Sequence, residues 1–205
     1  MRKINLTGKA TLILLIITFT IMGYCQAQGK TINPNLNDKE DAYLNRQANA
    51  FLTEISNTLK QYPPQFPRQP ERIQALLLLD AVMHDKYAAF RPPVQRFYQT
   101  RILNALQEIE NSNIKKGAKI WKLYNMGFIV KTKSVTIAFD LVSGESAGSE
   151  KFTIPNDIMG RFVDQCDVLF ISHRHRDHKD YLIAQRFIEQ KKPVVAPPQV
   201  WNDNP

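Results

Sequence analysis

The spacing of apolar residues changes near Gly117, and this change divides the chain into two kinds of secondary structure. Before it, apolar residues recur every three or four positions, which is the spacing of an amphipathic helix. After it, short runs alternate with polar residues or are continuously apolar, as in strands. We therefore predict an α-helical section over residues 28–115 and an α/β domain over residues 117–205.

Three helices are predicted in the front section. The first starts with a capping box at Asn37–Glu40 and continues for about twenty residues. Its apolar face comprises Leu44, Ala48, Phe51, Leu52, Ile55 and Leu59. The proline-rich segment 62–70 ends this helix, because proline lacks a backbone donor and disfavours helix in the residue before it. Helices at 70–83 and 93–109 follow. We interpret all three as packing for the second section, with a small helical domain or a cap over a site as alternatives.

The second section is predicted to alternate strands with helices. Strands are expected at 118–124, 127–131, 135–140, 167–172 and 193–196, and helices at 156–165 and 180–192. The last helix is expected to bury Ile183, Ala184, Phe187 and Ile188. Strands in alternation with helices predict the α/β fold class.

Residues 1–27 are predicted to be a signal peptide. Met1–Lys9 carries three basic residues and no acid, and Thr11–Met22 is an uninterrupted run of apolar residues and threonine. That run is shorter than the roughly 20 residues that cross a bilayer, but it fits the apolar region of a secretory signal. Ala27 supplies the small residue for cleavage before Gln28, so we expect a periplasmic or secreted protein. Lipidation of Cys25 and an uncleaved anchor are the alternatives; without either, we expect no stable membrane insertion.

Cysteine usage argues against an internal disulfide, and the charge argues against a nucleic-acid partner. Cleavage would remove Cys25, so Cys166 would have no partner for an internal disulfide. We interpret Cys166 as a small buried residue rather than a reactive thiol. The net charge of +8 is partly carried by the predicted signal peptide. The remaining excess is mild and spread along the chain, so we expect no nucleic-acid partner.

The densest group of chemically active residues is a histidine cluster. Three of the 4 histidines fall in the segment His173-Arg-His-Arg-Asp-His178, directly after a buried-type strand. A loop in that position is where α/β proteins place their sites, and imidazole and carboxylate are usual zinc donors. His173 and His175 can face one ion, and Asp177 and His178 a neighbouring position. We predict metal binding here; a solvated polar loop is the alternative. The fourth histidine, His84, is interpreted as a helix-terminal residue.

The pattern His-x-His-x-Asp-His after an apolar strand resembles the signature of the metallo-β-lactamase superfamily. The flanking segments 121–132 and 135–140 resemble the family's opening strands, and Lys192–Pro197 resembles the strand after its motif helix. The resemblance covers roughly residues 117–205. It implies an αββα sandwich, represented here in incomplete form by the first sheet and the motif helix, behind an α-helical N-terminal section.

The resemblance also implies roles for individual residues. His173 and His175 would belong to a first zinc site, and Asp177 and His178 to a second, so that a complete domain would hold two zinc ions. Asp140 would support the metal loop through hydrogen bonds. In the family, a hydroxide held between the metals attacks an ester, amide, lactam or phosphodiester bond, and Asp177 would act in catalysis by holding a proton. We therefore expect an exported zinc-dependent hydrolase with a small-molecule substrate.

Some ligands of the family's site are not found. The family adds a third histidine, a bridging aspartate and a final histidine, but no histidine follows His178. The later acids, Asp180, Glu189 and Asp203, do not occupy the expected position. The chain is thus expected to be part of a longer enzyme or a natural truncated form. A single sheet would also expose an apolar face, which costs about 25 cal/mol for each Å².

Two rival functions are considered. A catalytically inactive remnant could act as a binding protein through its helical section. A nuclease of the same superfamily is disfavoured by the export signal and the mild charge. The oligomeric state is left open.

Overall fold

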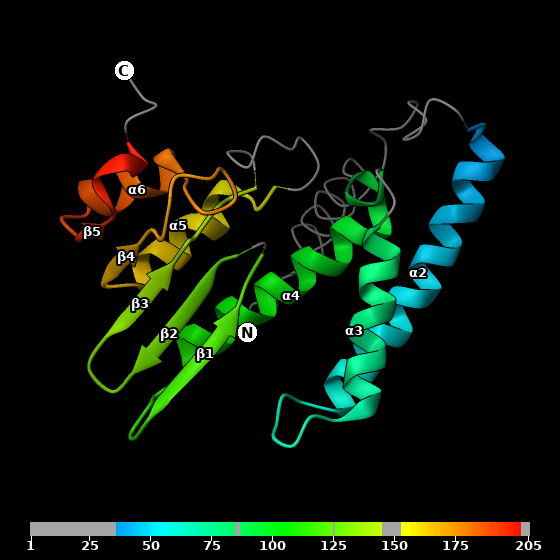
Figure 1. Ribbon diagram of the computed structural model, residues 1–205, viewed down its shortest axis with the longest axis horizontal. Coiled ribbons are helices and arrows are strands. Elements are labelled where there is room, and N and C mark those ends of the chain that lie inside the picture. Colours follow the sequence, from blue (N-terminus) through cyan, green and yellow to red (C-terminus); the bar gives the residue numbers. More distant parts are fainter. Residues whose placement is uncertain (1–35, 85–86, 125, 145–152, 202–205) are drawn as a thin grey trace, which may run out of the picture. The chain divides into compact units, whose positions relative to one another are not determined.

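The computed structural model describes residues 36–84, 87–124, 126–144 and 153–201 (Figure 1). Contacts divide the chain into two compact units, residues 1–41 and 42–205. The predicted signal peptide 1–27, with Cys25, lies outside the described residues. Among the described residues, no helix is both long and apolar enough to span a membrane.

The helical section contains α2 (Asp38–Gln61), α3 (Pro70–Met83), the short 3₁₀ helix η1 (Ala88–Phe90) and α4 (Pro92–Asn111). The capping box is confirmed: the Glu40 amide donates to Asn37 Oδ1 at 3.1 Å, and the Asn37 amide donates to Glu40 Oε2 at 2.9 Å. In the second unit, one apolar cluster joins the three helices; it contains Leu52, Ile55, Leu59, Ala75, Val94 and Phe97. The apolar face predicted for α2 is wider than the face that packs, since Leu44 and Phe51 are exposed.

A five-stranded mixed sheet follows, in the order β1 (Ala118–Lys122), β2 (Phe128–Thr132), β3 (Thr136–Phe139), β4 (Val168–Phe170) and β5 (Val194–Val195). The first three strands are antiparallel, and β3, β4 and β5 are parallel. Parallel neighbours need crossover connections. These contain α5 (Asn156–Gln165) and α6 (Tyr181–Glu189), and a 3₁₀ turn, η2 (Pro198–Val200), comes after β5. The predicted mixed α/β class is confirmed.

One face of the sheet is covered by helices. Its central side chains are Trp121, Ile129, Ala138 and Leu169, all buried. They share a core cluster with side chains of α4, α5 and α6. Cys166 belongs to this cluster, which confirms that it is buried. The prediction for Ile188 is wrong: α6 is short and turns this side chain outward, leaving it 63% exposed.

The opposite face of the sheet, which we call the open face, is also apolar. Its side chains lie in two rows given by the strand register: Ile120, Val130, Ile137 and Val168, then Phe128, Phe139, Phe170 and Val195. None of these eight side chains is buried. The rings of Phe139 and Phe170 stack with centroids 5.4 Å apart. The apolar exposed face expected of a single sheet is therefore present.

Candidate metal centre

The histidine cluster lies in the loop between β4 and α6, beyond the carboxyl end of β4. Asp140 lies just beyond the end of the neighbouring parallel strand β3, and its amide donates to Phe170 O at 2.9 Å. Because parallel strands end at the same edge of a sheet, residues that follow β3 and β4 meet there. The fold therefore brings together residues that are far apart in sequence. Asp140 forms hydrogen bonds with Ser172, 32 positions away, and with His178, 38 positions away.

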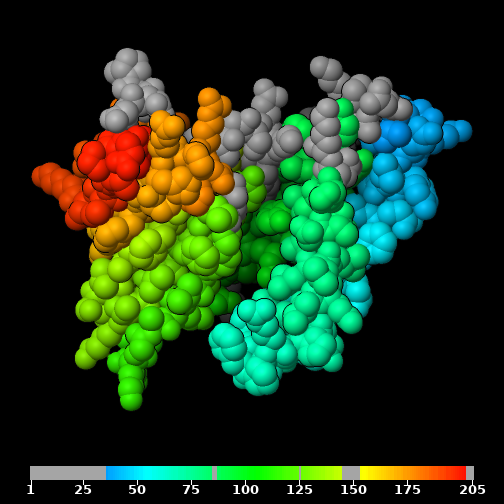
Figure 2. Space-filling model, in the orientation of Figure 1, coloured from blue at the N-terminus to red at the C-terminus, as the bar shows by residue number. Residues whose placement is uncertain are grey.

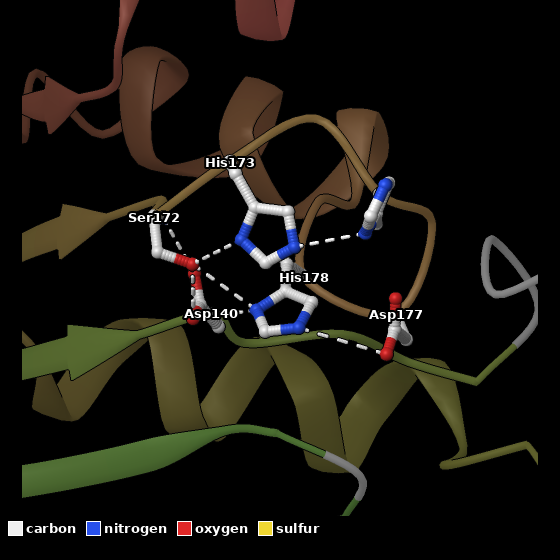
Figure 3. A network of polar contacts seen from close by, with 6 residues as sticks. Asp140, Ser172, His173, Asp177 and His178 are labelled. Carbon is white, nitrogen blue, oxygen red and sulfur yellow. Dashed lines mark hydrogen bonds and ion pairs between the residues drawn. The ribbon is translucent and has the colours of Figure 1, made fainter.

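Asp140 is the centre of the hydrogen-bond network (Figure 3). Its Oδ1 accepts from the Ser172 amide at 2.7 Å, and its Oδ2 accepts from Ser172 Oγ at 2.7 Å and from His178 Nδ1 at 2.9 Å. The residue is buried, with a φ of 47° in the left-handed region. Aspartate tolerates that region better than most residues. The structure thus places Asp140 in hydrogen-bond contact with the histidine loop.

These hydrogen bonds assign the ring tautomers of two histidines. Ser172 Oγ donates its proton to Asp140, so it accepts from His173 Nδ1, 2.9 Å away. His178 Nδ1 donates to Asp140 Oδ2. Both rings then carry their proton on Nδ1, which leaves Nε2 of His173 and of His178 with a free lone pair. Metal-binding histidines are oriented in this way by a partner on the other ring nitrogen.

The first potential ligand pair is His173 with His175. His173 Nε2 and His175 Nδ1 are 3.0 Å apart, and the ring centroids are 4.6 Å apart. Zinc binds imidazole at about 2.0–2.1 Å, so two nitrogens on one tetrahedral ion are separated by about 3.3 Å. The observed spacing is close to that value. Without a cation, His175 Nδ1–H donates to the lone pair of His173 Nε2.

The second potential pair is Asp177 with His178, as Figure 3 shows. Asp177 Oδ2 lies 3.6 Å from His178 Nε2, the nitrogen with the free lone pair. The His178 ring is stacked obliquely on the His173 ring, with centroids 3.8 Å apart. The two pairs are therefore adjacent. All five predicted site residues (Asp140, His173, His175, Asp177 and His178) join one network, whereas His84 forms the C-cap of α3.

The donor chemistry fits zinc, but each pair is only part of a coordination shell. Within the described ranges, no group of three or more His, Cys, Asp or Glu side chains is arranged to hold a metal ion. Zinc takes four ligands in structural sites and three protein ligands plus water in catalytic sites. The residues present thus fit two half-sites, each of which needs further ligands.

Sequence reasoning missed three residues that shape this loop: Ser172, Ser143 and Asp180. Asp180 is 1% exposed; its Oδ2 accepts from the Ser143 amide at 2.9 Å and from Ser143 Oγ at 2.7 Å. Its Oδ1 accepts from the Ile183 amide at 3.2 Å, which caps α6. This carboxylate ties the segment after β3 to the start of α6. An aspartate at the first position of the predicted helix 180–192 was the available signal for the cap, but no signal marked Ser143.

Gly127 and Lys122, from the β1–β2 hairpin, also lie near Asp140. A Cβ added to Gly127 would lie 3.2 Å from Asp140 O and 3.3 Å from Tyr124 O, so a larger residue here would need these backbone oxygens to shift slightly. Burial lowers the pKa of Lys122, and the Asp140 carboxylate opposes that shift. The environment of Asp140 therefore includes the β1–β2 hairpin as well as the histidine loop.

Comparison of the chain with protein-family models, with curated proteins and with solved structures found no match in any of the three.

Proposed function

We propose that this protein is an exported zinc-dependent hydrolase of the metallo-β-lactamase type, acting on a small-molecule ester, amide, lactam or phosphodiester. The observation that supports this most is the spacing of the two ligand pairs. Four donors from one loop face each other in pairs at 3.0 Å and 3.6 Å. In the neutral rings, hydrogen bonds from Nδ1 to Ser172 and Asp140 place the lone pair of His173 and of His178 on Nε2. A solvated polar loop needs no such arrangement.

The proposed roles follow from the donor atoms. His173 Nε2 and His175 Nδ1 would hold one zinc ion, with the His175 proton moved to its Nε2. Asp177 Oδ2 and His178 Nε2 would hold the other. Bound zinc lowers the pKa of water to about 7 and polarises the bond under attack. Asp177, at the more exposed end of its pair, would accept and hold the proton that the reaction releases. Asp140 would keep the Nε2 lone pair of His178 directed at its ion by binding Nδ1–H.

The finer fold, an αββα sandwich, belongs to the same proposal. The open face supports it, because eight apolar side chains on one sheet face are the kind of surface on which a second sheet packs. A second sheet would also be the source of the ligands that the half-sites need. Export is proposed from residues 1–27 alone.

Zinc content tests the proposal directly. The protein is isolated from cells, dialysed against zinc and measured by elemental quantification per chain, beside the His173→Ala/His175→Ala double variant. We expect the double variant to lose the zinc of the first site. His84→Ala is the matched control, because it removes the one histidine outside the cluster and should leave the zinc content unchanged. Unchanged zinc content in the double variant would refute the site.

A further variant tests the role of Asp140. Asp140→Asn keeps the shape of the side chain but weakens the acceptor for His178 Nδ1. Loss of such an orienting partner typically lowers metal affinity by about 10–100-fold. A chelator competition titration measures this change, with circular dichroism to verify that the variant is folded.

Turnover separates the enzyme from its rival, an inactive remnant that acts as a binding protein. The zinc-loaded protein is assayed against generic ester, lactam and phosphodiester substrates, with a chelator as the control. We expect hydrolysis that the chelator abolishes. Zinc binding without any chelator-sensitive turnover, in a folded and monodisperse sample, would favour the remnant.

A further inference from the structure

Beside α3, away from the histidine loop, lies a shallow groove of about 530 Å³ that the proposed hydrolase does not use. We call it the α3 groove. Its walls are formed by the proline-rich segment after α2 and by one side of α3; the main lining residues are Pro64, Phe66, Arg68, Arg72, Leu76 and Leu77. Small-molecule sites have volumes of about 300–1,000 Å³, so the groove is large enough for a ligand. Figure 2 shows this segment and α3 in cyan-green on the visible face.

The groove exists because α3 is apolar on more than one side. Its inner side packs into the helical core through Ala75, with Leu78 and Leu79 partly buried against the same cluster. Its outer side carries Leu77, which is 64% exposed, beside Leu76. Leu76 and Leu77 therefore form an apolar strip of α3 that stays largely exposed.

The loop across the groove adds a second apolar wall. Phe66 is 93% exposed, so its ring has almost no contact with the rest of the chain. Large exposed apolar side chains on one patch commonly mark a binding surface. Phe66 and Leu77 line the same groove from different segments, which makes the patch concave rather than flat.

The charge at the groove has one sign. Arg68 and Arg72 are the charged side chains among the described residues that line the groove, and none of those residues is a carboxylate. Arg72 is held in place, because its Nη1 donates to Tyr62 O at 2.9 Å. Arg68 is exposed and forms no hydrogen bond or ion pair with any described residue. Guanidinium groups bind carboxylate and phosphate through paired hydrogen bonds, so this end of the groove favours an anionic group.

We propose that the α3 groove binds a free, single-chain anionic amphiphile, a molecule with one hydrocarbon tail and one acidic head. The tail would lie against Leu76, Leu77 and Phe66, and the head would pair with Arg68 and Arg72. Each methylene that leaves water stabilises the complex, and the concave wall suits one tail rather than a bilayer surface. This site is independent of the zinc site, so each proposal can fail without the other.

Dodecanoate is the probe that tests the site. It is titrated calorimetrically into the isolated protein below its micelle-forming concentration, and dodecyltrimethylammonium, with the same tail and a positive head, is titrated in parallel. We expect saturable binding of one dodecanoate, about tenfold tighter than that of the cation. Equal affinity for both probes would overturn the role of the arginines, and absence of saturable binding would overturn the site.

Matched variants locate the binding. Leu77→Ser and Arg68→Gln should each weaken dodecanoate binding by about tenfold without lowering the melting temperature, because both side chains are exposed. Leu103→Ser and Arg96→Gln change exposed residues of α4 in the same way and should leave binding unchanged. Equal losses in the α4 variants would contradict the assignment. Binding to vesicles that contain dodecanoate, but not to free dodecanoate, would show a membrane surface instead.

Discussion

The two faces of the sheet have similar apolar content but different surroundings. Ile129 on β2 is completely buried, whereas Ile120 on the adjacent strand β1 is 63% exposed. The register explains this difference: Ile129 pairs with Trp121 on the covered face, and Ile120 pairs with Val130 on the open face. Burial in this protein thus depends on which side the helices lie, and not on how apolar a strand residue is.

The connections explain why only one face is covered. Both crossover helices, α5 and α6, contribute to the same core cluster, and α4 joins them there. In a doubly wound sheet, helices would cover both faces. Here the sheet keeps a large apolar surface on the other side, which is the property that makes a second sheet part of our proposal.

The reactivity of thiols on the two faces should show the largest contrast. Burial raises the pKa of Cys166 to about 12, and alkylation requires the thiolate. In an Ile120→Cys variant, we expect iodoacetamide to modify the new thiol at the rate of a free cysteine. Cys166 should react about a thousandfold more slowly, because opening of the core must come first.

Peptide-level mass spectrometry measures both positions in one sample. A denatured sample provides the control, since both thiols should then react at similar rates. Comparable rates at the two positions in the folded protein would mean that the covered face opens easily, and the contrast between the faces would then be lost.

Truncation of matched isoleucines tests the comparison through stability. Ile129→Ala removes buried methyl groups and leaves a cavity, so the free energy of unfolding should fall by about 2–5 kcal/mol. Ile120→Ala should lower it by less than about 1 kcal/mol, because its side chain is largely in water already. Urea denaturation followed by circular dichroism measures both. A large loss for Ile120→Ala would indicate that the open face is covered in solution.

The smallest change in the free energy of unfolding is expected for a substitution of Glu108, where α4 contacts β1 at the edge of the covered face. Glu108 Oε2 accepts from Lys119 Nζ at 2.9 Å and from Trp121 Nε1 at 3.1 Å. The hydrogen bonds from Lys119 and Trp121 lower the pKa of Glu108. Because the pair is half-exposed and screened by solvent, Glu108→Gln should reduce the free energy of unfolding by less than about 1 kcal/mol at neutral pH.

The difference in the free energy of unfolding between wild type and Glu108→Gln should depend on pH with a defined sign. A lowered pKa in the folded state stabilises the protein above the ordinary glutamate pKa of about 4.3, and this contribution is lost as pH falls through the folded-state value. The gap between wild type and Glu108→Gln should therefore close in acid. Glu54→Gln, at an exposed position of α2, is the control and should show no gap at either pH. A gap that grows in acid would contradict the assignment.

Much of the secondary structure was predictable because local signals agreed. A capping box and prolines marked the starts of the three front helices, and the change of apolar spacing near Gly117 separated helices from strands. The errors concern burial. Ile188, Leu44 and Phe51 have the spacing of buried residues, but their side chains are exposed. Periodicity indicates which side chains share a face, whereas burial also needs a neighbour for that face.

The candidate site divides in the same way. The three histidines and Asp177 were found from sequence because they are neighbours in one short segment. That Asp140 supports the histidine loop was expected only through the family resemblance, and the contribution of Ser143 was not expected at all. Asp140 and His178 are 38 positions apart, and Ser143 and Asp180 are 37 positions apart. A local sequence pattern cannot reveal contacts between residues so far apart.

By itself, the sequence determined the type and order of the elements and the set of potential metal donors, because both depend on residues close together in the chain. Tertiary structure decided the rest: which sheet face is covered, which ring nitrogens are left free, and how the donors pair. Those properties depend on the parallel pairing of β3 with β4 and on the side to which α5 and α6 cross. Both are set by packing between distant segments, since a strand with two apolar faces carries no local signal for the side that will be buried.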